Sequence, residues 1–233
     1  MAVFDKFAEK YDEGHVNAVK ASGFKPDYFH EYKLKEIFAY LKLIGWAEKK
    51  LTILNFGCGT GNSEKYIKQY LPNSSICSTD VSEECIRVAI KANQVLSDVT
   101  FRYYDGKNIP FENNFDIIFI FNVFHHILRK NQTEILQMLS GKLKNNGLLF
   151  MFELNPINPL TLWVAINNDY KFDKNAKLLS PIYAYKILKN TGFKIYKIKY
   201  TIFFPNFLSL FLPLEKYLSW LPLGAHYYYI VGK

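Results

Sequence analysis

Short apolar runs alternate with helical segments through most of the chain, and this alternation restricts the fold more than any other feature. Apolar runs of strand length stand at 51–56, 75–79, 99–104, 115–121 and 148–154. Helical patterns lie between them at 62–71, 82–94 and 131–143, and beyond them at 178–190, before strands at 193–204 and 226–232. Strands separated by helices form parallel sheets with right-handed crossovers. The sequence therefore predicts a doubly wound α/β fold with a mostly parallel seven-stranded sheet and an antiparallel edge formed by the last two strands.

The net charge of +8 does not by itself predict a nucleic-acid partner. Lysine supplies nearly all of the positive charge, and only Arg87, Arg102 and Arg129 could read phosphates or bases in the way arginine does. The basic residues are dispersed, apart from three lysines within 194–199. No nucleic-acid motif accompanies them, so we expect no nucleic-acid partner.

Cysteines, histidines and apolar runs narrow the class of protein further. The three cysteines lack CxxC spacing and the five histidines lack HExxH spacing, so we expect reduced thiols and no metal. The N-terminus is charged and has no apolar leader. No apolar run reaches the roughly 20 residues that span a bilayer. These features predict a cytoplasmic protein, peripheral to the membrane at most.

A glycine loop follows the first predicted strand directly and opens a helix. The residues are Gly57-Cys58-Gly59-Thr60-Gly61. Glycines permit a tight turn and a close ligand, and the helix that follows offers unpaired N–H groups. A dinucleotide fingerprint needs GxGxxG, whereas this spacing is GxGxG with Asn62 at the final position. The loop predicts a ligand site that is not built for a pyrophosphate.

Polar residues end the next three strands of the predicted sheet. Asp80 follows the second strand, Asp105-Gly106 the third and Asn122 the fourth. Open α/β sheets bind ligands at the carboxyl ends of their strands, and a carboxylate about 20 residues beyond the glycine loop suits a ribose. Each residue alone would also suit a loop or a cap, but these three positions, together with the glycine loop at the same edge, predict a binding site.

The ordered segments LNFGCGTGN, STDVSEECI, YYDGKNIPF, FDIIFIFNVFHHI and LKNNGLLFMFE resemble the motifs of class I S-adenosylmethionine-dependent methyltransferases, over roughly residues 50–155. The resemblance implies a Rossmann-like fold with S-adenosylmethionine as cofactor. It implies that Gly57, Gly59 and Gly61 pass beneath the methionine and ribose, and that Asp80 holds the ribose hydroxyls. Val81 would pack on the adenine, Asp105 and Gly106 would bind its amino edge, Asn122 would lie near the methionine end, and Tyr11 would close over the cofactor.

Asn55 departs from the family pattern, which usually has Asp or Glu at the end of the first strand. Asparagine keeps the hydrogen-bonding shape but removes a negative charge facing the cofactor's ammonium group. By this reasoning Asn55→Asp is expected to tighten cofactor binding, and more so at low salt.

The second half of the chain resembles a bacterial subgroup of these methyltransferases with an FExNPxNP…FFP…LPLGA signature, often associated with glycan or lipid-linked precursor assembly. The matching segments are FELNPINP, FFP and LPLGA. Leu154 stands where the subgroup has histidine. The resemblance implies one domain over 1–233, with an N-terminal helical cap (1–48), a cofactor-binding core (49–155) and an acceptor-side half (156–233) containing a helical insertion (205–224).

Methyl transfer to oxygen or carbon requires removal of a proton from the acceptor. His126, just past the fourth strand, is the first candidate for the base, with His125 next; Glu153 would orient the acceptor. A histidine packed on the core is an equally good interpretation of either position. The expected reaction is O-methylation of a small-molecule, glycan or lipid-linked acceptor.

Two other functions stay open. A non-catalytic methyltransferase-like binding protein would fit Asn55 and Leu154, and an NAD(P)-dependent oxidoreductase would share the fold but not the glycine spacing.

The aromatic and leucine-rich segment 203–224 is either a membrane-facing surface or a lid over the acceptor.

Overall fold

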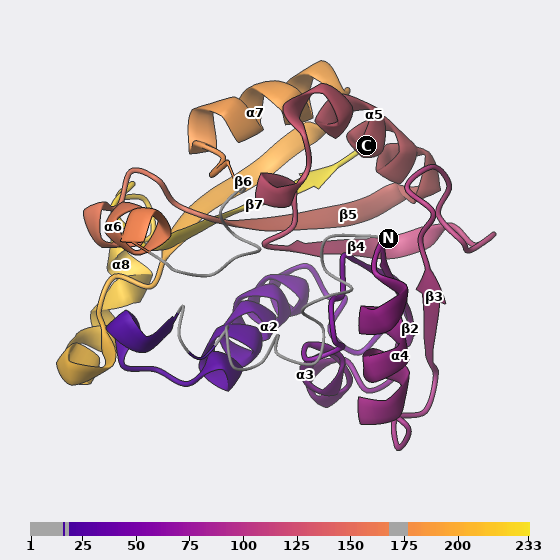
Figure 1. The fold of residues 1–233 in the computed structure, drawn as a ribbon, viewed down its shortest axis with the longest axis horizontal. Coiled ribbons are helices and arrows are strands. Elements are labelled where there is room, and N and C mark those ends of the chain that lie inside the picture. The colour runs from indigo at the N-terminus through magenta and orange to yellow at the C-terminus, as the bar shows by residue number, and fades with distance from the viewer. Residues whose placement is uncertain (1–15, 17–18, 168–176) are drawn as a thin grey trace.

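The computed structural model describes residues 16, 19–167 and 177–233. Seven strands in this part form one sheet (Figure 1). Their order in the sheet is β3-β2-β1-β4-β5-β7-β6. The strands are β1 (Thr52–Phe56), β2 (Ser75–Asp80), β3 (Val99–Tyr103), β4 (Phe115–Phe121), β5 (Leu143–Leu154), β6 (Lys194–Thr201) and β7 (His226–Gly232). Within the described strands only β7 is antiparallel, and it lies between β5 and β6. The predicted doubly wound, mostly parallel sheet is confirmed; the edge strand is β6.

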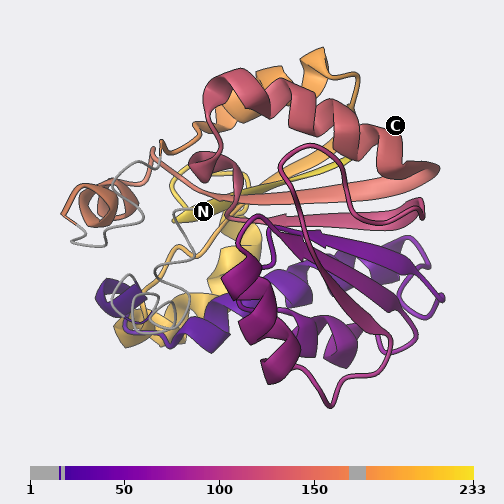
Figure 2. The same cartoon turned by 45° about the vertical axis from the view of Figure 1, so that its right-hand side comes forward.

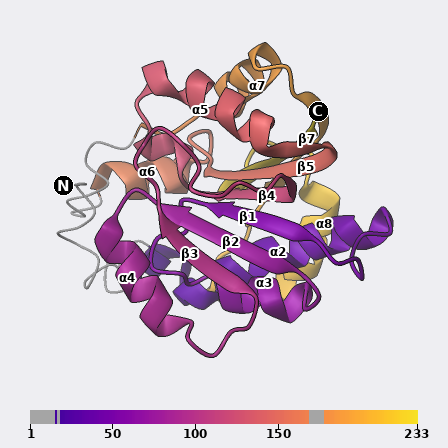
Figure 3. The ribbon, with the colours of Figure 1, turned by 90° about the vertical axis from the view of Figure 1, so that its right-hand side faces the viewer.

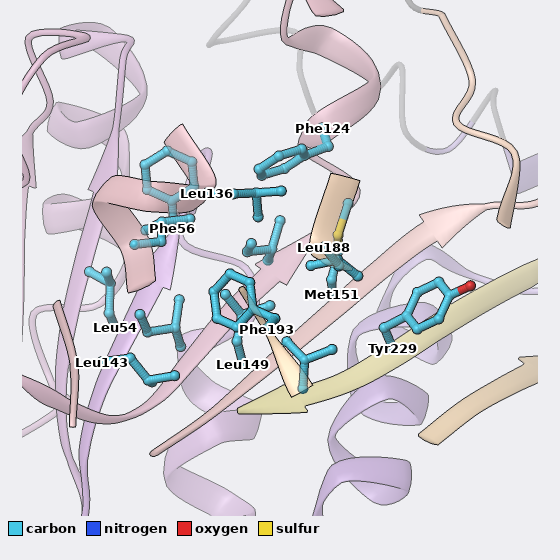
Figure 4. Close-up of a cluster of buried hydrophobic side chains, with 14 of the residues drawn as sticks. Leu54, Phe56, Phe124, Leu136, Leu143, Leu149, Met151, Leu188, Phe193 and Tyr229 are labelled. Carbon is cyan, nitrogen blue, oxygen red and sulfur yellow. The ribbon is translucent and has the colours of Figure 1, made fainter. Parts of the chain in front are cut away.

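Helices cover both faces of the sheet (Figure 3). They are α2 (Pro26–Leu43), α3 (Glu64–Tyr70), α4 (Glu83–Ala92), α5 (Arg129–Lys142), α6 (Pro159–Asn167), α7 (Pro181–Asn190) and α8 (Glu215–Leu218), with short 3-10 segments η3 (Lys20–Ser22), η4 (Phe124–His126) and η5 (Asn206–Leu214). Leu34 and Ile37 of α2 and Ile67 of α3 pack on one face. Leu136 of α5 and Leu188 of α7 pack with Met151 on the other (Figure 4). The central strands are buried on both faces, as their continuous apolar sequences predict.

Two local features differ from the sequence prediction. Helix α6 was not expected, and β5 begins five residues before the predicted strand 148–154, so that Asn145-Asn146-Gly147 falls inside it. The pairing of β4 with β5 shifts between Phe115–Leu143 and Ile117–Leu148, so the polar residues form an irregularity in the ladder instead of a separate turn. Helix α4 has a side-chain cap at its start, where Ser82 Oγ accepts from Cys85 N at 3.1 Å.

Both long excursions of the second half leave the carboxyl edge of the sheet. Helix α6 follows β5, and η5 with α8 follows β6, which is parallel to β5. Asn155 joins them, because its Nδ2 donates to Pro222 O at 3.1 Å and Gly224 O at 2.8 Å. Figure 2 shows the indigo turn before α2 beside the yellow η5, where a β-carbon on Gly23 would stand 3.2 Å from Asn206 Cβ. No helix among the described residues is long and apolar enough to cross a membrane.

Candidate functional site at the carboxyl edge of the sheet

The glycine loop (residues 57–61) leaves β1 at the carboxyl edge. Gly57, Gly59 and Gly61 have positive φ angles of 76°, 54° and 78°, which residues with a β-carbon adopt at a cost. The N–H groups of Gly57 and Cys58 both donate to Thr79 O of β2, at 2.8 and 3.0 Å. A β-carbon on Gly57 would stand 2.5 Å from Val123 Cγ2. The loop therefore requires glycine for its conformation and for its close packing.

Asp80, at the end of β2, holds this loop in place. Its Oδ2 accepts from Gly59 N at 2.9 Å, and its Oδ1 accepts from Ser82 N at 2.9 Å. A carboxylate accepts about four hydrogen bonds in all, so these two are compatible with further bonds to ligand hydroxyls. Val81, the next residue, is 39% exposed, which is high for an apolar side chain at a strand end.

Asp105 and Gly106 follow β3 and form an exposed turn. Asp105 Oδ1 accepts from Lys107 N at 2.8 Å and from Asn108 N at 2.9 Å. These backbone bonds stabilise the carboxylate and hold the pKa of Asp105 below its ordinary value. Gly106 has a φ of 86°. Hydrogen bonds between the Asp105 side chain and the backbone thus stabilise this turn. It lies at the same edge of the sheet as the glycine loop.

A pocket lies beneath the glycine loop, between α2 and the ends of β1 and β4. Its lining includes Asn55, Gly57 and Asn122, three of the residues that sequence reasoning assigned to the cofactor. Asn122 has a φ of 57°, a conformation that asparagine tolerates better than most residues. Asn55 Oδ1 and Asn122 Oδ1 are buried and have no hydrogen-bond partner in the described part of the chain. The pocket therefore presents two acceptors suited to N–H donors of a ligand.

Lys33 of α2 lines the same pocket and was missed by sequence reasoning. It is only 4% exposed, and its Nζ lies 5.4 Å from the centre of the Phe121 ring. Lys33 forms no ion pair with an acid among the described residues. Burial lowers the pKa of Lys33 to about 8, against the opposing effect of Glu153. A sequence signal existed: Lys33 lies four residues from Phe29 and from Ile37, on the buried stripe of the helix.

The polarity of this pocket suits a zwitterion such as the amino acid end of S-adenosylmethionine. Lys33 is the complement of a carboxylate, and the oxygens of Asn55 and Asn122 are the complement of an ammonium group. His30 also lines the pocket and forms a 2.9 Å hydrogen bond between its Nδ1 and Ser63 Oγ. These side chains fit the cofactor that the sequence predicts.

The two candidate histidines occupy different environments in η4, directly after Asn122. His125 is buried, and its Nδ1 lies 2.7 Å from Glu153 Oε2; Glu153 Oε1 accepts from Phe124 N, also at 2.7 Å. The ring of His126 lies against that of His125, with ring centres 4.0 Å apart and an interplanar angle of 48°. Burial, with a smaller effect of His125, lowers the pKa of His126 to about 2. Glu153 therefore fixes His125, whereas His126 resists protonation.

Glu64 is a second residue that sequence reasoning missed. It is fully buried at the start of α3 and accepts a hydrogen bond from Asn55 Nδ2 at 2.8 Å. The pattern of apolar and polar residues could not reveal its burial, because Glu64 stands among polar residues in the first turn of the helix. Tyr11 lies outside the described residues, so its predicted role remains a prediction.

Comparison with known proteins agrees with this geometry. Residues 54–149 match the family model described as a methyltransferase domain. The demethylmenaquinone methyltransferase of Thermotoga maritima is 29% identical over 159 residues, covering 68% of this chain and 62% of that protein. The malonyl-[acyl-carrier protein] O-methyltransferase of Bacillus cereus is 29% identical over 99 residues, covering 42% of this chain and 36% of that protein. The chain thus spans less than two thirds of the length of either relative.

A solved structure extends the similarity to the whole fold. Magnesium protoporphyrin IX methyltransferase from Synechocystis PCC 6803, solved with bound SAH (S-adenosylhomocysteine), is 16% identical, with a TM-score of 0.65 over 98% of this chain and 99% of that one. The glycine loop, Asp80 and Asn122 all fall within the matched domain. Residues 54–149 are therefore similar to a methyltransferase domain, and the chain has the Rossmann-like fold seen in S-adenosylmethionine-dependent methyltransferases.

Proposed function

We propose that this chain is an S-adenosylmethionine-dependent methyltransferase. The observation that carries the proposal is the pocket beneath the glycine loop, where buried Lys33 accompanies the unpaired oxygens of Asn55 and Asn122. An unpaired buried lysine and unpaired buried amide oxygens are costly unless a ligand satisfies them. When bound, S-adenosylmethionine supplies a methyl group activated by its positively charged sulfur.

Each residue at this edge has a proposed part in holding the cofactor. Lys33 binds the carboxylate, and Asn55 and Asn122 accept from the ammonium group. The glycine loop passes beneath the methionine and ribose, and Asp80 binds the ribose hydroxyls while fastening the loop. Val81 packs on the adenine, and Asp105 with Gly106 contacts its amino edge.

Calorimetry with four ligands tests this assignment. The chain is expected to bind S-adenosylmethionine and S-adenosylhomocysteine and to show no measurable heat with NAD or NADP. Asp80→Ala is expected to weaken S-adenosylhomocysteine binding by about 1–3 kcal/mol, because it removes a charged acceptor. Asp116→Asn, which changes an acid bonded to Thr52 N at the opposite edge, is the control. Tight nicotinamide binding without an S-adenosylhomocysteine signal would establish the oxidoreductase alternative.

We infer that His125 acts as the general base for an oxygen or carbon acceptor, with Glu153 as its orienting partner. The support is the 2.7 Å contact at Nδ1, which directs the opposite ring nitrogen away from Glu153. His126 was ranked first from sequence, but a histidine with a pKa of about 2 is a weak proton acceptor. A purely binding role for the chain gives no reason for the His125–Glu153 pair.

The proposed acceptor is amphiphilic, and a lipid-linked glycan precursor is the example that the FExNPxNP…LPLGA signature suggests. Helix α6, η5 and α8 all follow the carboxyl edge and expose large apolar side chains. The most exposed of these are Trp163, Ile166, Phe207, Leu210 and Tyr217, and Trp220, just after α8, is also exposed. Several large apolar side chains exposed on neighbouring elements support a surface that contacts lipid or another apolar partner. The acceptors named for the two relatives differ from each other, so neither is carried over.

Sedimentation with anionic vesicles tests the membrane part of this proposal. Phe207 is 80% exposed and Phe211 is 42% exposed. Replacing both with serine is expected to reduce vesicle binding at least several-fold, because apolar insertion is lost. The matched control is Leu43→Ser with Val95→Ser, since these residues are 77% and 91% exposed and precede strands at the opposite edge. If the wild-type chain does not bind anionic vesicles at any salt concentration, segment 203–224 is a lid over the acceptor and not a membrane-facing surface.

A further inference from the structure

Three buried polar side chains from three elements meet behind the pocket. Glu64 Oε1 accepts from Asn55 Nδ2 at 2.8 Å and from Ser78 Oγ at 2.6 Å. Asn55 is 1% exposed, and the other two are fully buried. We call these three residues the Glu64 cluster. It joins β1, β2 and α3 immediately below the glycine loop.

The cluster determines which end of the Asn55 amide faces the pocket. A carboxylate only accepts hydrogen bonds, so the group that meets Glu64 Oε1 must be the amide nitrogen. The Asn55 oxygen is thereby turned away from Glu64, and it has no partner in the described part of the chain, although Asn55 lines the pocket. Without an acceptor at residue 64, the amide could rotate and present its donor instead. Glu64 therefore makes Asn55 an acceptor.

The negative charge of Glu64 requires an explanation of its own. Burial raises its pKa, although Ser78, Asn55 and the backbone N–H groups of Glu64 and Ser63 oppose the shift, and its Oε2 has no hydrogen-bond partner among the described residues. A glutamine would accept the same two hydrogen bonds without burying a charge. A carboxylate that is buried and only half satisfied is expected where a cation is bound. Within the pocket, Lys33 is the complement of the ligand's carboxylate, so the cation belongs to the ligand.

We propose that Glu64 supplies the negative charge of the amino-group subsite and acts through Asn55 as its positioning residue. The inference rests on the proposed function, because S-adenosylmethionine carries the amino group concerned. Asn55 contacts the ligand, and Glu64 stands behind it. The expectation that Asn55→Asp tightens binding is then reversed, since an aspartate would bring a second carboxyl group against Glu64 Oε1.

Binding of two ligands by Glu64→Gln tests the subsite. S-Adenosylhomocysteine carries the amino acid end, whereas methylthioadenosine lacks it. Glu64→Gln is expected to weaken S-adenosylhomocysteine about tenfold and to leave methylthioadenosine within about twofold of wild type. The matched control, Glu48→Gln, removes an exposed acid before β1 at the opposite edge and is expected to change neither. Equal loss for both ligands would indicate a general effect on the loop and would overturn the inference.

A charge-swap cycle measured without ligand tests the pairing itself. Asn55→Asp is expected to lower the midpoint of thermal unfolding at pH 7 by about 4 °C or more, because two carboxyl groups share one buried contact. Adding Glu64→Gln reverses the wild-type pair, because the new amide at position 64 can donate to the new carboxylate at position 55. The double variant is therefore expected to regain wild-type stability. It is also expected to bind S-adenosylhomocysteine within about threefold of wild type, since the site keeps one negative charge.

The outcomes separate this inference from the function on which it rests. Absence of S-adenosylhomocysteine binding by the wild-type chain would overturn the proposed function and this inference together. Wild-type binding that Glu64→Gln retains in full would overturn the inference alone. A double variant no more stable than Asn55→Asp would show that the two side chains are not a coupled pair.

Discussion

Replacing Lys33 with methionine is expected to weaken S-adenosylhomocysteine binding about 100-fold, because the variant loses a charge-assisted bond inside a buried pocket. Methionine preserves much of the apolar stem that packs near Phe121. Lys35→Met is the control, since Lys35 lies two residues further along the same helix, and its exposed side chain pairs with Glu31. Calorimetry on the three proteins measures the difference. An unchanged affinity in Lys33→Met would remove this lysine from the proposed cofactor site.

The same substitution is expected to stabilise the protein without ligand. Lys33 has an ordinary pKa of 10.5 in the unfolded chain and a pKa of about 8 in the fold. Between these values the unfolded state binds more protons, so stability falls as pH falls from about 10.5 to 8 and stays low below that range. Methionine removes this loss, and Lys33→Met should exceed wild type at pH 7 by about 1–3 kcal/mol. Denaturant unfolding at pH 7 and 10 should show the gap narrowing at the higher pH.

His125→Asn is expected to lower turnover about 100-fold or more for an acceptor that must lose a proton, with little change in S-adenosylhomocysteine affinity. Asparagine can still donate to Glu153, so the buried acid keeps a partner. His126→Asn is expected to lower turnover less than tenfold, because its low pKa makes it a poor proton acceptor. Transfer of a labelled methyl group to cell-envelope extracts, and then to the purified acceptor, provides the assay.

In the same assay, Glu153→Gln shows whether Glu153 orients His125 for catalysis or only stabilises the fold. If Glu153 orients His125 and stabilises its protonated form, the variant should shift the acid limb of the turnover profile to lower pH, because the histidine is then charged less readily. A variant with reduced stability and an unshifted profile would leave Glu153 a structural role only. If His126→Asn is the more damaging of the two histidine substitutions, the roles assigned to the histidines must be exchanged.

The architecture and part of the site could be predicted from local sequence. Continuous apolar runs such as FDIIFIF in β4 predict strands that are buried on both faces of the sheet. The spacing of the glycine loop excludes the GxGxxG fingerprint of dinucleotide-binding proteins. The polar residues after β2, β3 and β4 were expected at one edge because parallel strands end there together. Helix α6 and the irregular start of β5 were not found, since pairing with β4 and the Asn155 bonds to the chain before β7 act across long sequence separations.

The sequence by itself determined the order of the strands and of most helices, the glycine loop and the kind of site at the carboxyl edge, because periodicity and turn chemistry are local properties. Only the tertiary structure decided which charges meet there. Lys33 is 22 residues before Asn55, and Glu64 is nine residues after it, yet the first lines the same pocket as Asn55 and the second bonds to it. His125 likewise meets Glu153 through the pairing of β4 with β5. The charge and hydrogen-bonding of a buried group depend on neighbours distant in sequence, and folding alone brings those neighbours together.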